Sequence, residues 1–134
     1  MKGPAAVLDA GVVDRAATDR EFRDHLRGLV QAGLTPIIPA VVLAEALTGT
    51  GRDAPVNLTL RRFGTTLTDE RIARQAGRLR SDAAVDGGRR VPSGIDAIVA
   101  SHAVDAESGV VFTTDPSDLR RLLANHPRIA VRKP

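Results

Sequence analysis

SGIDAIVASHAVDAESGVVFTTDPSD, residues 93–118, is the stretch that decides the fold of this chain. Ser93 stands three residues before Asp96 as a helix-capping pair, and apolar residues then recur at helical spacing. The short apolar run 110–112 is typical of a buried strand. Asp115 follows as the N-cap of another helix, with proline at the first helical position. The stretch therefore predicts helix, strand and helix, with a carboxylate on each side of the strand.

The rest of the chain continues this alternation of strands and helices. Short apolar runs predict further strands at residues 5–8, 36–38 and 129–131, and we expect another strand at residues 64–67. Helical periodicity or helix-start signals occupy residues 18–33, 40–47, 57–62 and 68–83. Strands that alternate with helices form parallel sheets with helices on both faces. We expect a three-layer α/β/α sandwich with a parallel sheet of four to five strands.

Two of the helical segments carry explicit boundary and core signals. Thr18 and Glu21 form a capping box, and Gly33 is placed to end that helix. Thr68 marks the start of the second segment, ahead of two acidic residues. The predicted buried faces are Phe22, Leu26, Leu29 and Val30 in the first helix and Ile72, Ala73, Ala76, Leu79 and Ala83 in the second.

Length and composition limit the class of protein. The chain has 134 residues, of which 43% are hydrophobic and 26% charged, and this predicts one globular domain over residues 1–134. Because the sequence contains no cysteine, disulfide scaffolds, zinc–cysteine sites and thiol catalysis are excluded, and a cytoplasmic location fits best. No run of about 18 apolar residues occurs, so we expect no contact with a membrane.

Acidic residues follow two of the predicted strands. Asp9 comes directly after the run 5–8, and Asp115 comes shortly after the strand of the opening stretch. In an open parallel sheet, ligands bind beyond the carboxyl ends of the strands, and Asp96 is free to converge on the same region. Each acid also has a simpler explanation, because Asp commonly caps helices and Asp118 would complete such a cap at Asp115.

Glu45 differs from these acids because it is the one charged residue among the apolar residues 40–47. A helix that is apolar nearly all round is buried, so we expect Glu45 to be buried. A buried carboxylate without a partner is costly and usually neutralises or binds a cation. The pattern therefore favours a functional role for Glu45.

Several carboxylates without histidine or cysteine favour a hard cation, Mg²⁺ or alternatively Mn²⁺. Such sites activate water and stabilise the leaving oxygen of a phosphodiester, which is nuclease chemistry. The G-x-G-x-x-G, P-loop and G-x-S-x-G motifs of rival enzyme classes are absent. The net charge of +3 comes almost wholly from arginine, whose planar fork suits phosphate oxygens, since Lys2 and Lys133 are the only lysines.

Four segments together resemble a known family. They are VLDAG at residues 7–11, IPAVVLAEALTG at 38–49, GIDAIVASHA at 94–103 and FTTDPSDLRRL at 112–122. Each segment is weakly specific alone, but in this order, with these helices between them, they resemble the PIN-domain ribonucleases. The resemblance is closest to the VapC-like toxins of bacterial toxin–antitoxin pairs, and it spans nearly the whole chain.

The resemblance implies a magnesium-dependent endoribonuclease whose catalytic and metal-binding acids are Asp9, Glu45, Asp96 and Asp115. Asp118 would be a fifth acid in a supporting role. Many members of the family carry Ser or Thr shortly after the first acid, where this chain has Ala10 and Gly11, so Thr113 or Thr114 would supply the hydroxyl instead. The resemblance also implies a homodimer and a cognate antitoxin protein whose tail enters the acidic groove.

Arg89 and Arg90 lie in a glycine-bearing loop just ahead of the helix that carries Asp96. Positive charge at the rim of an acidic centre would steer RNA into it, and the alternative is a loop that is merely solvated. A second interpretation of the whole chain is a PIN-like module that has lost catalysis and only binds RNA or a partner protein. Magnesium-dependent turnover of RNA distinguishes these two functions.

Overall fold

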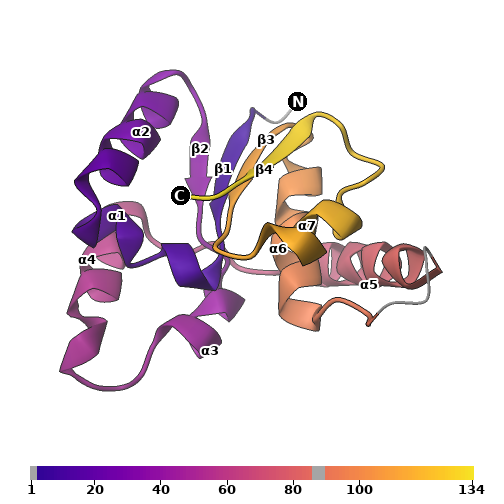
Figure 1. Cartoon of the computed structure of the whole chain (residues 1–134), viewed down its shortest axis with the longest axis horizontal. Helices are drawn as coiled ribbons and strands as arrows, with labels where there is room; N and C mark the ends of the chain where they lie inside the picture. Colours follow the sequence, from indigo (N-terminus) through magenta and orange to yellow (C-terminus); the bar gives the residue numbers. More distant parts are fainter. Residues whose placement is uncertain (1–2, 86–89) are drawn as a thin grey trace.

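A parallel sheet forms the centre of the molecule in the computed structural model, which describes residues 3–85 and 90–134 (Figure 1). Its strands are β1 (Ala5–Leu8), β2 (Thr35–Ile37), β3 (Gly109–Phe112) and β4 (Ile129–Arg132), in the order β2-β1-β3-β4. Neighbouring strands pair in parallel throughout. The strands predicted at 5–8, 36–38, 110–112 and 129–131 are confirmed to within one residue.

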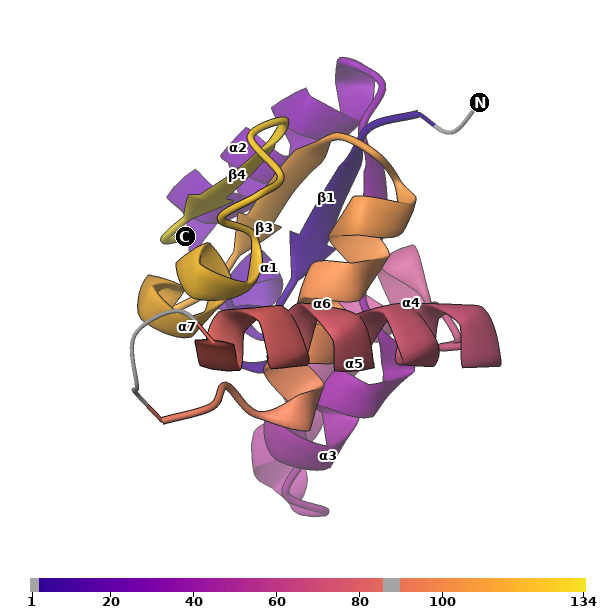
Figure 2. The ribbon, with the colours of Figure 1, turned by 90° about the vertical axis from the view of Figure 1, so that its right-hand side faces the viewer.

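Helices cover both sides of this sheet, which confirms the predicted three-layer α/β/α sandwich (Figure 1, Figure 2). One side carries α1 (Arg15–Thr18), α2 (Arg20–Gln31) and α4 (Ala54–Phe63), and the other carries α5 (Glu70–Val85), α6 (Gly94–Asp105) and α7 (Pro116–Leu122). The short helix α3 (Leu43–Ala46) and the 3-10 helices η1 (Ala10–Val12), η2 (Ala40–Val42) and η3 (Gly51–Asp53) complete the described elements. Within residues 3–85 and 90–134, no helix has the length and apolarity needed to cross a membrane.

The core lies around β1, whose four residues are all buried. Val7 pairs with β2 on one side and with β3 on the other, as expected for a continuous apolar run in a parallel sheet. The predicted faces of α2 and α5 are buried or half-buried with two exceptions. Val30 and Ala73 are exposed, because each stands at the edge of its apolar stripe.

The predicted capping box of α2 is wrong by one residue. Asp19 is the N-cap and accepts a hydrogen bond from the Phe22 amide at 3.1 Å, whereas Thr18 ends α1. An aspartate directly ahead of the helix satisfies the first free amides as well as a threonine does. Gly33 follows the helix with φ of 104°, as predicted for a C-terminal glycine.

The strand predicted at residues 64–67 is reduced to a single bridge. Pro39 and Thr66 pair, with hydrogen bonds from the Thr66 amide to the Ile38 carbonyl at 2.8 Å and from the Ala40 amide to the Thr66 carbonyl at 2.9 Å. The ladder ends there because the chain turns into η2 directly after Pro39. Leu67 is 80% exposed, so this segment adds nothing to the core.

Candidate functional site

Asp9 lies at the carboxyl end of β1, where the sheet register brings it beside Thr113. Leu8 pairs with Phe112, so the next residue of each strand also comes together. Thr113, which is buried, donates its hydroxyl to Asp9 Oδ2 at 2.8 Å. Asp9 Oδ1 accepts the Ala10 amide at 2.8 Å and caps η1. The carboxylate of Asp9 is therefore held by two hydrogen bonds while remaining half-buried.

Glu45 is exposed, so the prediction that it would be buried is wrong. The segment 40–47 is not one helix but two short ones, η2 and α3, and none of the residues of α3 is buried. Val42 fills the core, whereas Glu45 faces a cleft of about 530 Å³ that it shares with Asp9 and Asp14. The apolar residues thus cover one side of the segment and leave the carboxylate at the site.

Asp96 lies in the first turn of α6, where the Ser93 hydroxyl accepts the Asp96 amide at 3.1 Å as predicted. Burial raises the pKa of the Asp96 carboxyl to about 6, and repulsion from Asp9, Asp118 and Glu45 adds to that increase. A hydrogen bond from Ser93 partly offsets these effects. Carboxylates from four segments of the chain therefore share one electrostatic environment.

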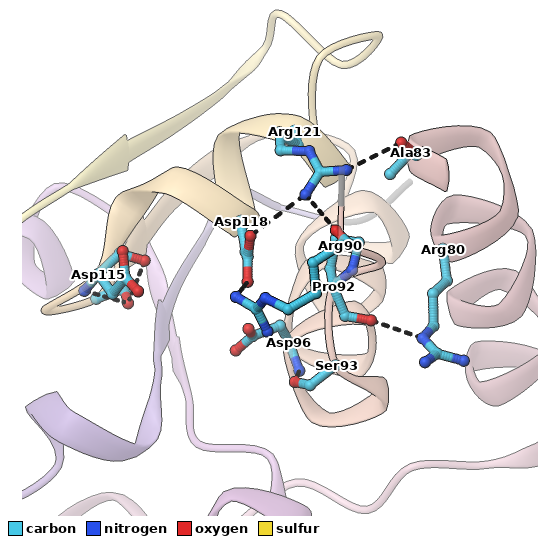
Figure 3. A network of polar contacts seen from close by, with 10 residues as sticks. Arg80, Ala83, Arg90, Pro92, Ser93, Asp96, Asp115, Asp118 and Arg121 are labelled. Carbon is cyan, nitrogen blue, oxygen red and sulfur yellow. Dashed lines mark hydrogen bonds and ion pairs between the residues drawn. The ribbon is translucent and has the colours of Figure 1, made fainter. Parts of the chain in front are cut away.

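Asp115 occupies the N-cap of α7, but its side chain makes no capping hydrogen bond. Its amide donates to the Thr113 hydroxyl at 3.1 Å, so Thr113 links the backbone of Asp115 to the carboxylate of Asp9. The Asp115 side chain is exposed and lies apart from Asp96 and Asp118 (Figure 3). Asp115 and Glu45 are thus the two predicted acids that are exposed to solvent.

Asp118 is nearly buried and forms ion pairs with two arginines (Figure 3). Arg90 Nη2 lies 3.0 Å from one carboxylate oxygen, and Arg121 Nη1 lies 3.5 Å from the other. Arg121 also donates to the Arg90 carbonyl at 2.7 Å. This network holds Arg90 against Asp118, whereas Arg89 lies outside the described residues. Arg121 was not predicted, although its spacing of three residues from Asp118 on one helix is a detectable signal.

Thr114 lies over Gly11 at the edge of the cleft. A Cβ atom at position 11 would come within 2.7 Å of the Thr114 hydroxyl, so glycine leaves the space that this side chain occupies. The sequence prediction missed three charged residues that line the same cleft, namely Asp14, Arg52 and Asp53. They come from the segments after η1 and α3, which carry no recognisable motif.

The donor chemistry of this site suits a hard cation. Asp9, Glu45 and Asp96 offer only carboxylate oxygens, the ligands that magnesium and manganese prefer, and water would complete the coordination. Within residues 3–85 and 90–134, no three His, Asp or Glu side chains already stand as a complete metal-binding group. The acids are thus gathered in one region, but their side chains do not converge on one point.

A match to a protein-family model identifies the family of this chain. The model of the PIN domain matches residues 6–122, which include each of the acids discussed above. The chain belongs to the PIN domain family. A search of curated proteins finds no match.

Solved structures share the fold of this PIN domain at low sequence identity. VapBC2 from Rickettsia felis, bound to a DNA fragment from its promoter, has a TM-score of 0.71 at 18% identity and covers 96% of this chain and 98% of that one. DNA-bound VapBC from Salmonella typhimurium has a TM-score of 0.61 at 19% identity, covering 97% and 98%. FitAcB from Neisseria gonorrhoeae has a TM-score of 0.59 at 19% identity, covering 94% and 95%. At these identities the comparisons show the fold alone.

Proposed function

We propose that this PIN domain is a metal-dependent endoribonuclease that acts as the toxin of a toxin–antitoxin pair. The observation that carries the proposal is the crowding around Asp96, whose pKa is raised to about 6 by burial and by Asp9, Asp118 and Glu45. A divalent cation would relieve the repulsion among these carboxylates, and ligands of open parallel sheets bind in this region, beyond the carboxyl ends of the strands. The proposed catalytic and metal-binding residues are Asp9, Glu45, Asp96 and Asp115, with Mg²⁺ or Mn²⁺ as the cation.

Each residue has a distinct part in this proposal. Asp9, oriented by the Thr113 hydroxyl, and Glu45, at the cleft, would hold the cation from the β1 side. Asp96 would hold it from the first turn of α6. When bound, the cation activates water and neutralises the charge that develops on the scissile phosphate. Asp115 would complete the acid set from the N-terminus of α7.

Asp118 has a supporting part because its carboxylate is already bound to Arg90 and Arg121. A carboxylate satisfied by two guanidinium groups is a weaker candidate for a metal ligand than one that faces the cleft. We assign RNA binding to Arg89 and Arg90. For Arg90 the support is its ion pair with Asp118, one of the acids whose charge acts on Asp96, and for Arg89 it is the sequence alone.

The similar structures support the proposal of a protein partner. Two of these are named as VapBC assemblies and one as FitAcB, at 18% to 19% identity over nearly the full chain. We propose that this PIN domain likewise binds a cognate antitoxin protein, that it forms a homodimer, and that it acts in the cytoplasm, where its RNA substrate is found.

The test is RNA cleavage by the purified protein with magnesium and with EDTA. We expect magnesium-dependent cleavage by the wild type, and a loss of at least about a hundredfold in Asp9→Asn and in Asp96→Asn, because each removes a charged ligand. Asp82→Asn, a change of the same kind at an exposed position of α5, should cleave normally. Cleavage that survives either active-site change contradicts the assignment, and RNA binding without any turnover indicates the inactive binding module.

A further inference from the structure

Arg52 is a cation in a cleft lined by carboxylates. Among the described residues that line the cleft, it is the one basic side chain beside Asp9, Asp14 and Glu45. Other arginines of the chain, such as Arg71 and Arg74, form ion pairs with nearby acids. Within residues 3–85 and 90–134, Arg52 has no such pair, so its guanidinium group is available to a ligand.

The turn that carries Arg52 is fixed by its neighbours. The buried carboxylate of Asp53 accepts the Thr48 amide at 2.8 Å, the Thr48 hydroxyl at 2.7 Å and the Gly49 amide at 2.7 Å. Thr50 caps η3 by accepting the Arg52 amide at 3.2 Å. These hydrogen bonds, with that from the Thr48 hydroxyl foremost, hold the pKa of Asp53 below its usual range. The backbone at Arg52 is therefore held in place beside the acids.

Arg52 and Arg90 lie on different sides of the acidic centre. Arg52 lines the cleft together with Asp9 and Glu45, whereas Arg90 is bound to Asp118 beside Asp96. In Figure 1 the connection from α3 to α4 and the segment before α6 lie at the same end of the molecule as the carboxyl end of β1, on opposite sides of it. A polyanion that contacts both arginines must cross the carboxylates between them.

We infer that Arg52 binds a backbone phosphate of the RNA strand, so that the strand crosses the acidic centre between Arg52 and Arg90. This inference rests on the proposed function, since it places the substrate of that site. The planar guanidinium group matches two phosphate oxygens, and a cation on each side of the acids offsets their repulsion of the strand. The ligand is a single-stranded RNA backbone, contacted without regard to base sequence.

The experiment compares Arg52→Ala with Arg128→Ala, in steady-state cleavage of a single-stranded RNA oligonucleotide over a range of salt concentrations. Arg128 is exposed and lies just before β4, at the opposite end of the strands, so the control removes the same charge far from the cleft. For Arg52→Ala we expect KM to rise about threefold to tenfold with kcat within about twofold. The slope of log kcat/KM against log salt should become shallower by about 0.7, the value for one phosphate contact on a single strand. Arg128→Ala should change neither KM nor the salt slope.

Arg52→Lys and the double variant Arg52→Ala with Arg90→Ala complete the test. Lysine keeps the charge and should restore the salt slope while recovering only part of KM. In the double variant the slope of log kcat/KM against log salt should become shallower by about 1.4, because both contacts lie on one strand. If Arg52→Ala keeps the wild-type KM and salt slope, or if the double variant loses no more slope than one single variant, the inference is overturned while the proposed function stands.

A wild-type protein that cleaves no RNA overturns the proposed function, and the same oligonucleotide then tests Arg52 by fluorescence anisotropy. With magnesium present, Arg52→Ala should bind the RNA about threefold to tenfold more weakly than the wild type and Arg128→Ala should bind it equally. Equal binding by Arg52→Ala overturns the inference here too. Unchanged thermal unfolding of both variants excludes a loss of fold, as expected for exposed side chains.

Discussion

Asp96 holds its proton more tightly in the folded protein than in the unfolded chain, because burial and three neighbouring acids raise its pKa from 3.8 to about 6. Ionisation of Asp96 therefore costs folding free energy, and that cost grows as the pH rises from about 4 to about 6. Asp96→Asn removes it. Relative to the metal-free wild type, we expect the metal-free variant to gain on the order of 1 kcal/mol in the free energy of unfolding at pH 7.5. Near pH 4 we expect no change in that free energy.

Urea unfolding at the two pH values measures this difference. Asp82→Asn, at an exposed position, should show no dependence of its effect on pH. If Asp96→Asn changes the free energy of unfolding equally at both pH values, the raised pKa of Asp96 is contradicted.

Thr113 is the buried residue that orients Asp9, and its hydroxyl also accepts the Asp115 amide. Thr113→Val keeps the shape of the side chain and removes all hydrogen bonds of its hydroxyl. We expect RNA cleavage to fall about tenfold to a hundredfold, the usual cost of removing a partner of a metal ligand, with a loss of about 1–3 kcal/mol in stability. Cleavage assays and urea unfolding of the same preparation measure the two effects.

Thr59→Val is the matched control for Thr113→Val. Thr59 is also buried, and its hydroxyl donates to the Val13 carbonyl at 2.8 Å and to the Pro55 carbonyl at 3.2 Å rather than to a predicted acid. It should lose similar stability and keep its activity. Equal losses of activity in the two variants would show that Thr113 acts only on the fold.

Gly109, at the start of β3, lets the backbones of β1 and β3 approach closely. Its φ is 139°, and a Cβ atom there would come within 1.9 Å of the Ala5 carbonyl oxygen. Gly109→Ala must therefore separate the two central strands, and we expect a loss of more than about 3 kcal/mol or a failure to fold. Urea unfolding of the purified variant, or its absence from the soluble fraction, measures this.

At Gly77, substitution by alanine should have the opposite effect on stability. It lies in α5, where an added Cβ meets nothing within 4 Å. Gly77→Ala should stabilise the protein by about 0.5–1 kcal/mol, because alanine loses less backbone entropy in a helix. A stable Gly109→Ala protein, or a destabilised Gly77→Ala protein, would contradict this account of the two positions.

At the scale of elements, the sequence predicted strands and long helices well because their patterns are local. The run 5–8 and the Ser93 cap of α6 depend on neighbours within a few residues. Errors arose where a distant partner decides the outcome. Residues 64–67 have a strand composition, yet their only pairing among the described residues is with Pro39, where the partner segment turns away. Glu45 was predicted to be buried because a continuous helix was assumed for 40–47.

At the scale of the whole molecule, the sequence located the candidate acids but not the contacts that surround them. Asp9 and Asp96 could be found because each follows a recognisable element boundary. The ion pair of Arg90 with Asp118 and the place of Arg52 could not be found, since they depend on segments that only the tertiary fold brings together. Hydrogen bonds across 104 residues of sequence, such as that from Thr113 to Asp9, leave no local pattern.

The last prediction concerns the whole fold and its cation. A ligand that binds only the folded state stabilises it by about 2.7 kcal/mol at a hundredfold excess over Kd. For a domain of this size we expect Tm to rise by roughly 5–10 °C in magnesium at that excess, relative to sodium chloride of equal ionic strength. The gain should be larger at pH 7.5 than at pH 5, because the raised pKa keeps Asp96 largely protonated at the lower pH.

The variant with both Asp9→Asn and Asp96→Asn should lose the magnesium response but retain its fold. A wild-type Tm that does not respond to magnesium at neutral pH would mean that the acids at the carboxyl end of the sheet do not form a shared cation site.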